Sequence, residues 1–313
     1  MLLLIYVDDI FIIGPDTDCI DRVIRDLEQK FEMTDIGKLN DYLGVQIIEK
    51  DDHFELNQIK YIRKIMNEFR MNECKPTNVP MASLYIHNED EEIDENLPIR
   101  ELIGSLLYVA NKTRPDILFS TNWLSRFLTK PTKSLFNAAK QILRYLSGTI
   151  DKCLIIGCLE ENLLVYTDSS FGQGESKHST SGLVIRCGNS TIEWKSNKQR
   201  KISVSSCESE ITAIMDGYKC VTFIKQIFQF LKFNVNIIFK CDNQSVIHLI
   251  TNQKSMKRSR YFDIEIKKLI EVFQSKDNFR IEYVNTKQQY ADFLTKPISK
   301  KILEETNNSF FVN

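Results

Sequence analysis

The sequence predicts a mixed α/β protein, and its length, its composition and the order of its apolar segments all indicate this. The chain has 313 residues, of which 42% are hydrophobic and 27% charged. These values are ordinary for globular protein, and the length suits about two domains. Short apolar runs typical of strands alternate with longer stretches of helical periodicity. In the C-terminal half they follow the order three strands, helix, strand, helices, strand, helix, which predicts a mixed sheet with flanking helices.

Charge and cysteine content restrict the class of protein further. The formal net charge is −1, so the surface is not uniformly basic. Eight cysteines are scattered without a Cys-x-x-Cys pair and are expected to be reduced thiols. The apolar run before Asp8 is too short for a membrane span or a signal peptide. We therefore expect an intracellular protein that is not secreted and has no membrane partner.

The N-terminal part is predicted to contain two hairpins, each followed by a helix. The expected elements are a hairpin over 1–13, a helix over 17–31, strands over 42–48 and 54–56, and a helix over 58–69. Asp8 and Asp9 stand between the two apolar runs of the first hairpin, so its turn is expected to carry both acids. Two carboxylates at a hairpin tip could bind a divalent metal. An Asp-Asp pair also makes an ordinary tight turn, and this structural alternative stays open.

The middle of the chain is predicted to be a linker followed by helices. Pro76 and Pro80 precede an acidic stretch over 89–95, which is expected to be solvated. Residues 99–148 have helical periodicity. Within them, Thr113 is expected to cap a helix that has Pro115 in its first turn, and Gly148 to end the last one.

The C-terminal part carries the more specific pattern. Strands are expected over 163–167, 182–187, 191–194, 235–240 and 279–284, and helices over 207–231, 244–251, 261–273 and from about 287. Two groups of basic residues occur here: Lys195, Lys198, Arg200 and Lys201, then Lys254, Lys257, Arg258 and Arg260. Such groups can follow a phosphate backbone, although a single group can equally be ordinary wet surface.

Four acids fall at chemically useful points of this order. Asp168 is expected where the first strand ends, Glu210 in the first turns of the long helix, Asp242 after the fourth strand, and Asp292 in the last helix. Carboxylates from separate segments can meet at one end of a sheet and hold two divalent cations, for which Mg²⁺ is suited. Taken singly, Asp168 and Asp242 could instead be turn or cap residues.

The long helix offers two candidate glutamates. Ser205 and Glu208 fit a capping box, in which Glu208 would accept a hydrogen bond from the backbone amide of Ser205. Glu210 points elsewhere and borders the apolar stripe, where Ala213 and Gly217 leave room. A carboxylate at the edge of a core needs a partner, and a metal ion is one. The alternative is an ordinary exposed glutamate.

The sequence motifs around these acids resemble those of a known family, the Pol polyproteins of copia-type LTR retrotransposons. The C-terminal resemblance lies in Tyr166–Ser170, Ser179–Gly182, Trp194–Gln199, Ser205–Glu210, Cys241–Ser245 and Gln289–Pro297. Upstream it lies in Tyr6–Asp9, Leu102–Tyr108, Thr113–Ile117 and Leu143–Thr149. Each short string alone is weak, but the ordered set is specific.

The resemblance implies a domain order and a partial polymerase. Residues 1–75 would be part of a reverse transcriptase palm and thumb, 76–152 a linker and helical connection, and 153–313 an RNase H-like domain with a mixed five-stranded sheet. Asp8 and Asp9 would be the palm's metal-binding pair, and Leu43 and Gly44 would lie in the hairpin that grips the primer end. A third metal-binding aspartate precedes this hairpin in such polymerases. The polymerase site is therefore expected to be incomplete, without independent DNA synthesis.

For the nuclease half, the resemblance implies hydrolysis of the RNA strand in RNA/DNA hybrids. Asp168, Glu210, Asp242 and Asp292 would be catalytic and hold two Mg²⁺ ions, with Mn²⁺ as an alternative. Expected nucleic-acid contacts are Lys198, Ser205, Asn243, Gln244 and Arg258. Partners would be hybrid, DNA and the rest of the polyprotein, in the cytoplasm, in virus-like particles or in the nucleus. A non-catalytic nucleic-acid-binding module and a decayed remnant remain alternatives.

Overall fold

The computed structural model describes residues 1–157, 160–174, 176–251, 263–275 and 278–312. It divides into two compact units, Met1–Ile47 and Ile48–Asn313, and each is described by itself. Within the described ranges, no helix is both long and apolar enough to cross a membrane.

The first unit is built from small hairpins and one helix. β1 (Leu2–Tyr6) and β2 (Asp9–Ile13) pair antiparallel, and α1 (Thr17–Glu28) follows. β3 (Asp41–Tyr42) then pairs with the first residues of β4 (Val45–Glu49), the strand in which the chain passes from the first unit to the second. The first turn consists of Val7 and Asp8, with Val7 at φ 52°, whereas Asp9 already pairs with Tyr6. The turn thus carries one acid, and the expectation of two was wrong because the tight turn begins one residue earlier.

The predicted strand over 42–48 is interrupted. Leu43 and Gly44 have φ of 50° and 71°, in the left-handed region, so the chain reverses between β3 and β4. Glycine tolerates this conformation without steric cost, whereas Leu43 is strained there.

The second unit contains a helical core. It comprises α2 (Ile59–Glu68), α3 (Ile99–Lys112), η1 (Pro115–Ile117), α4 (Leu118–Ser125), α5 (Lys133–Ser147) and α9 (Lys300–Asn307). Buried side chains such as Ile65, Leu106, Leu146 and Phe310 share one apolar cluster. Beside it, β6 (Cys153–Ile156) pairs with β5 (Phe54–Asn57) on one side and β12 (Phe311–Val312) on the other. Residues from opposite ends of this unit thus complete one core.

The predicted cap at Thr113 did not form. Thr113 ends α3, and its buried hydroxyl donates to Gln58 Oε1 at 2.9 Å. The following turn is a 3₁₀ helix without a side-chain cap, starting at Pro115. A long-range partner therefore displaced the local capping interaction.

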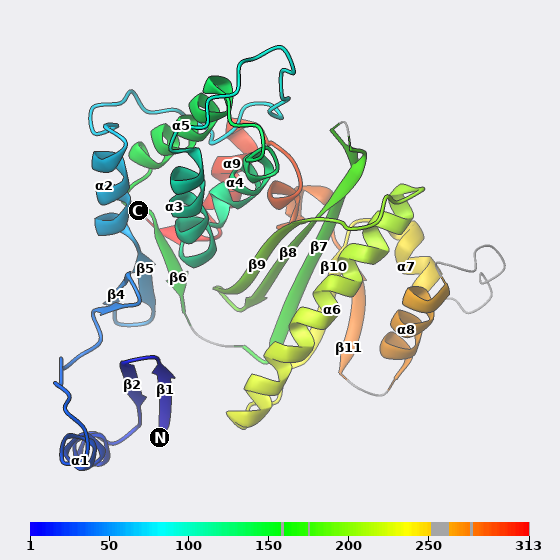
Figure 1. Ribbon diagram of the computed structural model, residues 1–313. Coiled ribbons are helices and arrows are strands. Elements are labelled where there is room, and N and C mark those ends of the chain that lie inside the picture. Colours follow the sequence, from blue (N-terminus) through cyan, green and yellow to red (C-terminus); the bar gives the residue numbers. More distant parts are fainter. Residues whose placement is uncertain (158–159, 175, 252–262, 276–277, 313) are drawn as a thin grey trace. The chain divides into compact units, whose positions relative to one another are not determined.

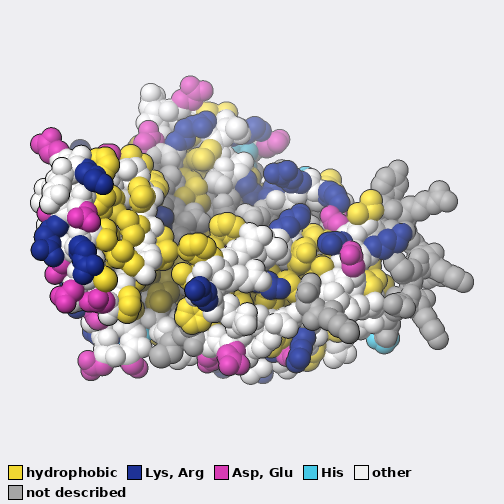
Figure 2. Space-filling model, turned by 90° about the horizontal axis from the view of Figure 1, so that it is seen from below, with side chains coloured by type: hydrophobic (Ala, Val, Ile, Leu, Met, Phe, Trp, Pro, Cys, Tyr) yellow, Lys and Arg dark blue, Asp and Glu magenta, His cyan; other side chains and the backbone are white. Residues whose placement is uncertain are grey.

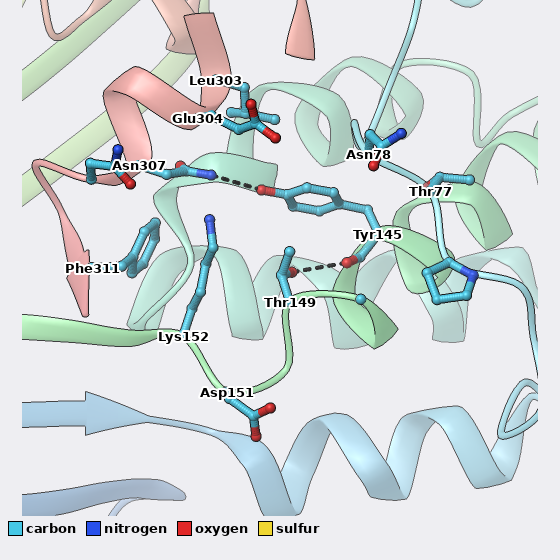
Figure 3. A pocket seen from close by; sticks show the side chains of 13 residues that line it. Thr77, Asn78, Tyr145, Thr149, Asp151, Lys152, Leu303, Glu304, Asn307 and Phe311 are labelled. Atoms are coloured by element: carbon cyan, nitrogen blue, oxygen red, sulfur yellow. Dashed lines mark hydrogen bonds between the residues drawn. The ribbon is translucent and has the colours of Figure 1, made fainter. Parts of the chain in front are cut away.

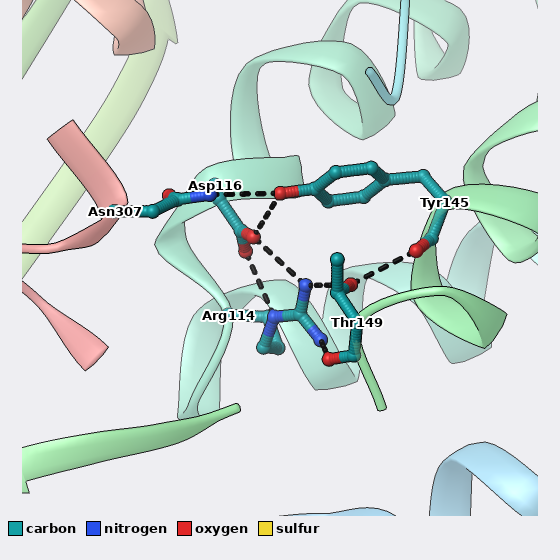
Figure 4. Close-up of polar contacts among 5 residues, drawn as sticks. All are labelled: Arg114, Asp116, Tyr145, Thr149 and Asn307. Atoms are coloured by element: carbon teal, nitrogen blue, oxygen red, sulfur yellow. Dashed lines mark hydrogen bonds and ion pairs between the residues drawn. The ribbon is translucent and has the colours of Figure 1, made fainter. Parts of the chain in front are cut away.

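A buried polar network ties these helices together (Figure 4). Arg114 is fully buried and donates to both carboxylate oxygens of Asp116, at 2.9 and 2.8 Å, and to the Thr149 carbonyl at 2.8 Å. The Tyr145 hydroxyl donates to Asp116 at 2.7 Å and accepts from the Asn307 side chain at 3.0 Å. Burial alone would raise the pKa of Asp116, but the adjacent Arg114 guanidinium lowers it overall.

A cavity of about 500 Å³ adjoins this network. Figure 3 shows the Tyr145 ring and the Lys152 side chain pointing into it, with Asn307, Glu304 and Phe311 contributed by the C-terminal segment. The described residues that line the cavity include acidic side chains as well as a lysine, so the charge of the cavity is mixed.

The remaining part of the second unit is a five-stranded sheet with helices against it (Figure 1). The strands are β7 (Asn162–Gln173), β8 (His178–Cys187), β9 (Ser190–Lys198), β10 (Asn236–Cys241) and β11 (Phe279–Tyr283), in the order β11-β10-β7-β8-β9. β10 runs parallel to β7 and β11, whereas β7, β8 and β9 are antiparallel. This confirms the predicted RNase H-like mixed sheet.

Alternate residues of the strands pack on opposite faces, as the period of two requires. Val165 and Phe239 lie in a cluster with α6 (Ser206–Phe230), α7 (Gln244–Thr251) and α8 (Asp263–Gln274). Tyr166, Val184 and Trp194 face the helical core instead. The sheet is therefore covered on both sides (Figure 1).

The last predicted helix differs from the structure. In place of a helix from about 287, there are two 3₁₀ turns, η3 (Thr286–Gln288) and η4 (Asp292–Leu294), and α9 begins only at Lys300. Gln289, between the turns, donates to the carbonyls of Thr167 and Lys240, at 3.0 and 3.2 Å. Binding to the sheet thus holds this segment in short turns.

Acidic and basic side chains are both present on the face shown in Figure 2. This agrees with the formal net charge of −1. A nucleic-acid site on this protein must therefore rest on local groups of residues.

Candidate active site

Three of the predicted acids meet at one end of the sheet. Asp168 lies on β7, Asp242 follows β10, and Glu210 is in the second turn of α6. Since β7 and β10 are parallel neighbours, with Tyr166 beside Lys240, their acids come to the same end. One ligand oxygen of each acid lies within 4.8 Å of those of the other two. They line an open cleft of about 510 Å³ together with Asn243, Gln244, Ser245 and Tyr283.

Asp168 is held firmly in the sheet. It is 6% exposed, and its Oδ2 accepts a hydrogen bond from the Thr295 hydroxyl at 2.8 Å. Burial and then the nearby Asp292 raise its pKa to about 6. The expectation that it ends its strand was wrong, because β7 continues to Gln173 in its hairpin with β8. Its parallel neighbour β10 does end at this level.

Glu210 is buried to the same extent as Asp168. It is 6% exposed, its Oε1 accepts from the backbone N–H of Ser169 at 3.2 Å, and its Oε2 is buried without a hydrogen-bond partner among the described residues. Burial and then the Asp168 carboxylate raise its pKa to about 9. A buried, unpaired carboxylate oxygen is costly unless a cation binds there.

The capping box predicted for Ser205 and Glu208 forms only in part. Ser205 Oγ accepts from the Glu208 N–H at 3.2 Å, as a helix cap does, but Glu208 Oε2 accepts from Val204 N–H at 2.7 Å, not from Ser205.

The expectation that Gly217 leaves room beside Glu210 was wrong, because a Cβ at Gly217 would lie 2.8 Å from Thr167 Cγ2. It lets α6 approach β7 closely.

The other two acids have partners of their own. Asp242 is half-buried, and its Oδ2 accepts from the Thr286 hydroxyl at 2.9 Å. Asp292 lies on η4 and forms an ion pair with Lys296 at 2.5 Å. The metal-capable group therefore contains three of the four predicted acids, and Asp292 stands beside it, close enough to raise the pKa of Asp168.

Sequence reasoning missed the residues that position these acids. Thr295 and Lys296 follow Asp292 at the spacing of one helical turn, and Thr286 and Gln289 precede it. All four lie within or next to the segment Gln289–Pro297 of the family resemblance, so their closeness to Asp292 was a usable signal. Their partners on β7 and β10 could not be read from local pattern.

The predicted nucleic-acid contacts are dispersed. Asn243 caps α7 by accepting from Ser245 N–H at 3.1 Å and lines the cleft with Gln244. Ser205 is exposed at the start of α6 outside the cleft lining, and exposed Lys198 lines a different cavity.

The remaining predicted contacts are not part of this cleft. In the first unit, Leu43 and Gly44 form a turn, and Asp8 and Asp9 are exposed. Arg258, with the basic group to which it belongs, lies outside the described residues.

Comparison with known proteins identifies the family. Residues 1–83 match the model described as reverse transcriptase (RNA-dependent DNA polymerase), and residues 166–296 the model described as reverse transcriptase-like. The chain is 30% identical over 316 residues to the retrovirus-related Pol polyprotein from transposon TNT 1-94 of Nicotiana tabacum, covering 97% of this chain and 24% of that protein. A putative transposon Ty5-1 protein of Saccharomyces cerevisiae is 33% identical, with 67% of this chain and 70% of that protein covered. The chain belongs to the copia-type retrotransposon Pol family.

This Pol-family chain spans about a quarter or less of the length of the first polyprotein relatives. A solved structure, the foamy viral protease-reverse transcriptase in complex with dsDNA, matches with a TM-score of 0.51 and 13% identity, over 91% of this chain and 55% of that one. At this identity the likeness supports the fold alone. The chain thus combines reverse transcriptase-like and RNase H-like parts of a Pol polyprotein.

Proposed function

We propose that the second unit is a metal-dependent endonuclease that hydrolyses the RNA strand of RNA/DNA hybrids. The observation that carries this proposal is the meeting of Asp168, Glu210 and Asp242 in an open cleft, with oxygens within 4.8 Å of one another. Structural carboxylates are usually neutralised by cations of the protein. Here Glu210 Oε2 has no such partner among the described residues.

The donor set fits a hard divalent cation. Mg²⁺ prefers carboxylate oxygen and keeps several waters, which an open cleft permits. Asp168, Glu210 and Asp242 would hold it, and Asp292 would support a second ion on exchanging its Lys296 partner. A bound divalent cation would supply Lewis acidity to the phosphodiester and stabilise its developing negative charge.

The residues of the chain hold the acids in place for this task. The Thr295 and Thr286 hydroxyls orient Asp168 and Asp242, and the Ser169 amide orients Glu210. Gln289 bonds both β7 and β10, which keeps the spacing of the two strand acids. Preorganisation of this kind lowers the barrier because no reorientation is needed during the reaction.

Polar groups along the cleft suit a nucleic-acid backbone. Asn243, Gln244, Ser245 and Tyr283 line it and offer side-chain donors and acceptors. In an RNA/DNA hybrid such groups can contact phosphates and 2′-hydroxyls.

For the first unit, we propose that Asp8 and Asp9 contribute two carboxylates of a polymerase site. We also propose that the protein acts inside the cell, where its nucleic-acid substrate occurs.

The test is cleavage of an end-labelled RNA/DNA hybrid in Mg²⁺ by the full chain. We expect the Asp242→Asn variant to lose more than about a hundredfold in rate, since a ligand of the cation is removed. Asp90→Asn, in the exposed loop before α3, is the matched control and should retain the rate.

Two outcomes would contradict the proposal. Undiminished cleavage by Asp242→Asn would refute the assigned site. Tight binding of the hybrid by the unaltered protein, without cleavage in either Mg²⁺ or Mn²⁺, would instead favour a non-catalytic binding module.

A further inference from the structure

A second cavity of the second unit has a lining of a different chemical kind. It measures about 550 Å³ and lies between the loop over 84–87, α4 with the residues after it, and the β7–β8 hairpin. Its described lining contains the aromatic residues Tyr85, Trp123 and Phe127 and the basic residues Arg126, Lys177 and Lys198. No carboxylate is among the described residues that line it. The described part of the lining is thus positively charged and aromatic, and the cavity has the size of a small-ligand site.

Arg126 is the central charge of this cavity. Its guanidinium lies over the Trp123 ring, 4.4 Å from the ring centroid, and donates one hydrogen bond, to Thr180 Oγ1 at 3.0 Å. The described residues place no carboxylate within ion-pair distance of it, and burial lowers its pKa to about 10. Most of its five N–H donors therefore lack an acceptor among the residues that the structure describes. A half-buried cation of this kind is stabilised by an anionic ligand.

The aromatic wall is already assembled. Trp123 Nε1 donates to the Tyr85 carbonyl at 2.8 Å, and the Tyr85 hydroxyl lies 3.0 Å from Ser134 Oγ. Across the cavity, the hairpin approaches so closely that a Cβ on Gly174 would come within 3.0 Å of Trp123 Cη2. A site whose walls are fixed in advance binds without a large ordering cost.

A polar group without a partner also borders the cavity. His87 stacks on Phe127 with an interplanar angle of 22°, and its Nδ1 is buried without a hydrogen-bond partner among the described residues. An imidazole nitrogen in this position can donate to, or accept from, the polar edge of a ring that stacks nearby. The cavity therefore offers stacking surface, one polar contact for a ring edge, and three cations.

We propose that this cavity binds one unpaired nucleotide of a nucleic-acid strand. The base would lie against the half-buried rings of Tyr85 and Phe127, next to buried Trp123, with its edge toward His87. The phosphate would contact Arg126, Lys177 and Lys198. Aromatic platforms combined with basic residues are the general means of holding single-stranded nucleic acid. An uncharged or cationic ligand would leave the three cations without an anionic partner.

The position along β7 connects the cavity to the cleft, and in this respect the proposal rests on the proposed function. Gly172, in the cavity, is four residues from Asp168 on the same strand, a distance of at most ~13 Å at the rise of a β-strand. A strand whose duplex part lies at the acids could therefore place an unpaired nucleotide in the cavity. Free nucleotides carry the same chemistry, and the experiment separates the two sources.

Tryptophan fluorescence gives a direct readout. The chain has two tryptophans, Trp123 in the cavity wall and Trp194 on β9, whose Nε1 donates to the Ala110 carbonyl. In a Trp194→Phe chain only Trp123 emits. Without metal, so that nothing is cleaved, we expect quenching by an RNA/DNA hybrid with a three-nucleotide single-stranded overhang, and little by the blunt hybrid of the same duplex.

Affinity by fluorescence anisotropy of labelled hybrids, with tryptophans unaltered, is the second measurement. We expect Arg126→Gln to lower the ratio of overhang to blunt affinity by about tenfold, the loss typical of a charge-assisted hydrogen bond. Lys301→Gln, an exposed lysine of α9 that does not line the cavity, is the matched control and should leave the ratio unchanged.

Three results would overturn the proposal. These are equal quenching by blunt and overhang hybrids, an unchanged affinity ratio in Arg126→Gln, or saturable quenching by AMP with the affinity of the overhang, which would make this a site for free nucleotides. Failure of the proposed nuclease is recognised separately. A protein that binds the overhang in this way but never cleaves a hybrid in Mg²⁺ or Mn²⁺ would refute the nuclease and leave the cavity assignment standing.

Discussion

Replacing Glu210 by glutamine should stabilise the metal-free protein, and more so as the pH rises. Burial and the Asp168 carboxylate raise the pKa of Glu210 from 4.5 to about 9. In the unfolded chain the group ionises near its ordinary value, whereas the folded protein keeps the proton. The folded state therefore binds more protons between these two values, and each pH unit in this window costs stability. Glutamine has no proton to lose and keeps the oxygen that accepts from Ser169 N–H.

The size of the effect follows from linkage. One pKa unit corresponds to about 1.36 kcal/mol, and both pH 5 and pH 8 lie within the window, so the advantage of Glu210→Gln over the unaltered protein should grow by about 4 kcal/mol from pH 5 to pH 8. A gain of that size is a large part of the stability of an ordinary domain.

Urea unfolding in EDTA at the two pH values measures this difference directly. Glu305→Gln, an exposed glutamate of α9, controls for the chemistry of the substitution. If the advantage of Glu210→Gln is the same at pH 5 and pH 8, or if the variant is less stable at both, then Glu210 is not a desolvated acid and the reasoning fails.

Three further changes test the site and the core. Millimolar Mn²⁺ at pH 8 should raise the Tm of the unaltered protein in a calorimetric scan but raise it less in Glu210→Gln, because binding to the folded state alone stabilises it; equal shifts would place the ion elsewhere. Gly182→Ala should lower the free energy of unfolding by about 1–3 kcal/mol in urea, since its Cβ would lie 2.5 Å from the Ala291 carbonyl oxygen, whereas Gly104→Ala, with open space in α3, should not destabilise. Asp116→Asn should cost about 3–5 kcal/mol because it leaves Arg114 buried without its counter-ion, and a loss below 1 kcal/mol would show that the pair is dispensable.

The sheet and the meeting of its acids were predictable because both follow from local pattern. Apolar runs of strand length, such as the one around Val165, form strands wherever both faces can be covered. The sequence order then predicts which strands run parallel, and with it that Asp168 and Asp242 reach the same end. Glu210 was predictable from its place relative to the helix cap.

What could not be predicted depends on contacts between segments distant in sequence. Thr113 was expected to cap a helix but donates a hydrogen bond to Gln58, and Asp292 was expected to lie in the last helix but lies in a 3₁₀ turn next to the sheet. Arg126 carried no signal, because its environment is created only when the β7–β8 hairpin packs against Trp123. In each of these cases, contacts with distant segments determine the local structure, and the conformational preference of the local sequence does not.

The contribution of the C-terminal segment to the helical core has a consequence for synthesis on the ribosome. Leu303 and Phe310 are buried in the same cluster as the helical residues from Ile62 to Leu146, and the Asn307 side chain donates a hydrogen bond to the Tyr145 hydroxyl. During translation, the helices around α5 thus leave the exit tunnel while the side chains that cover them are not yet made. This core can therefore be completed only after Phe310 has left the tunnel, and until then the exposed apolar surface is a natural binding site for chaperones.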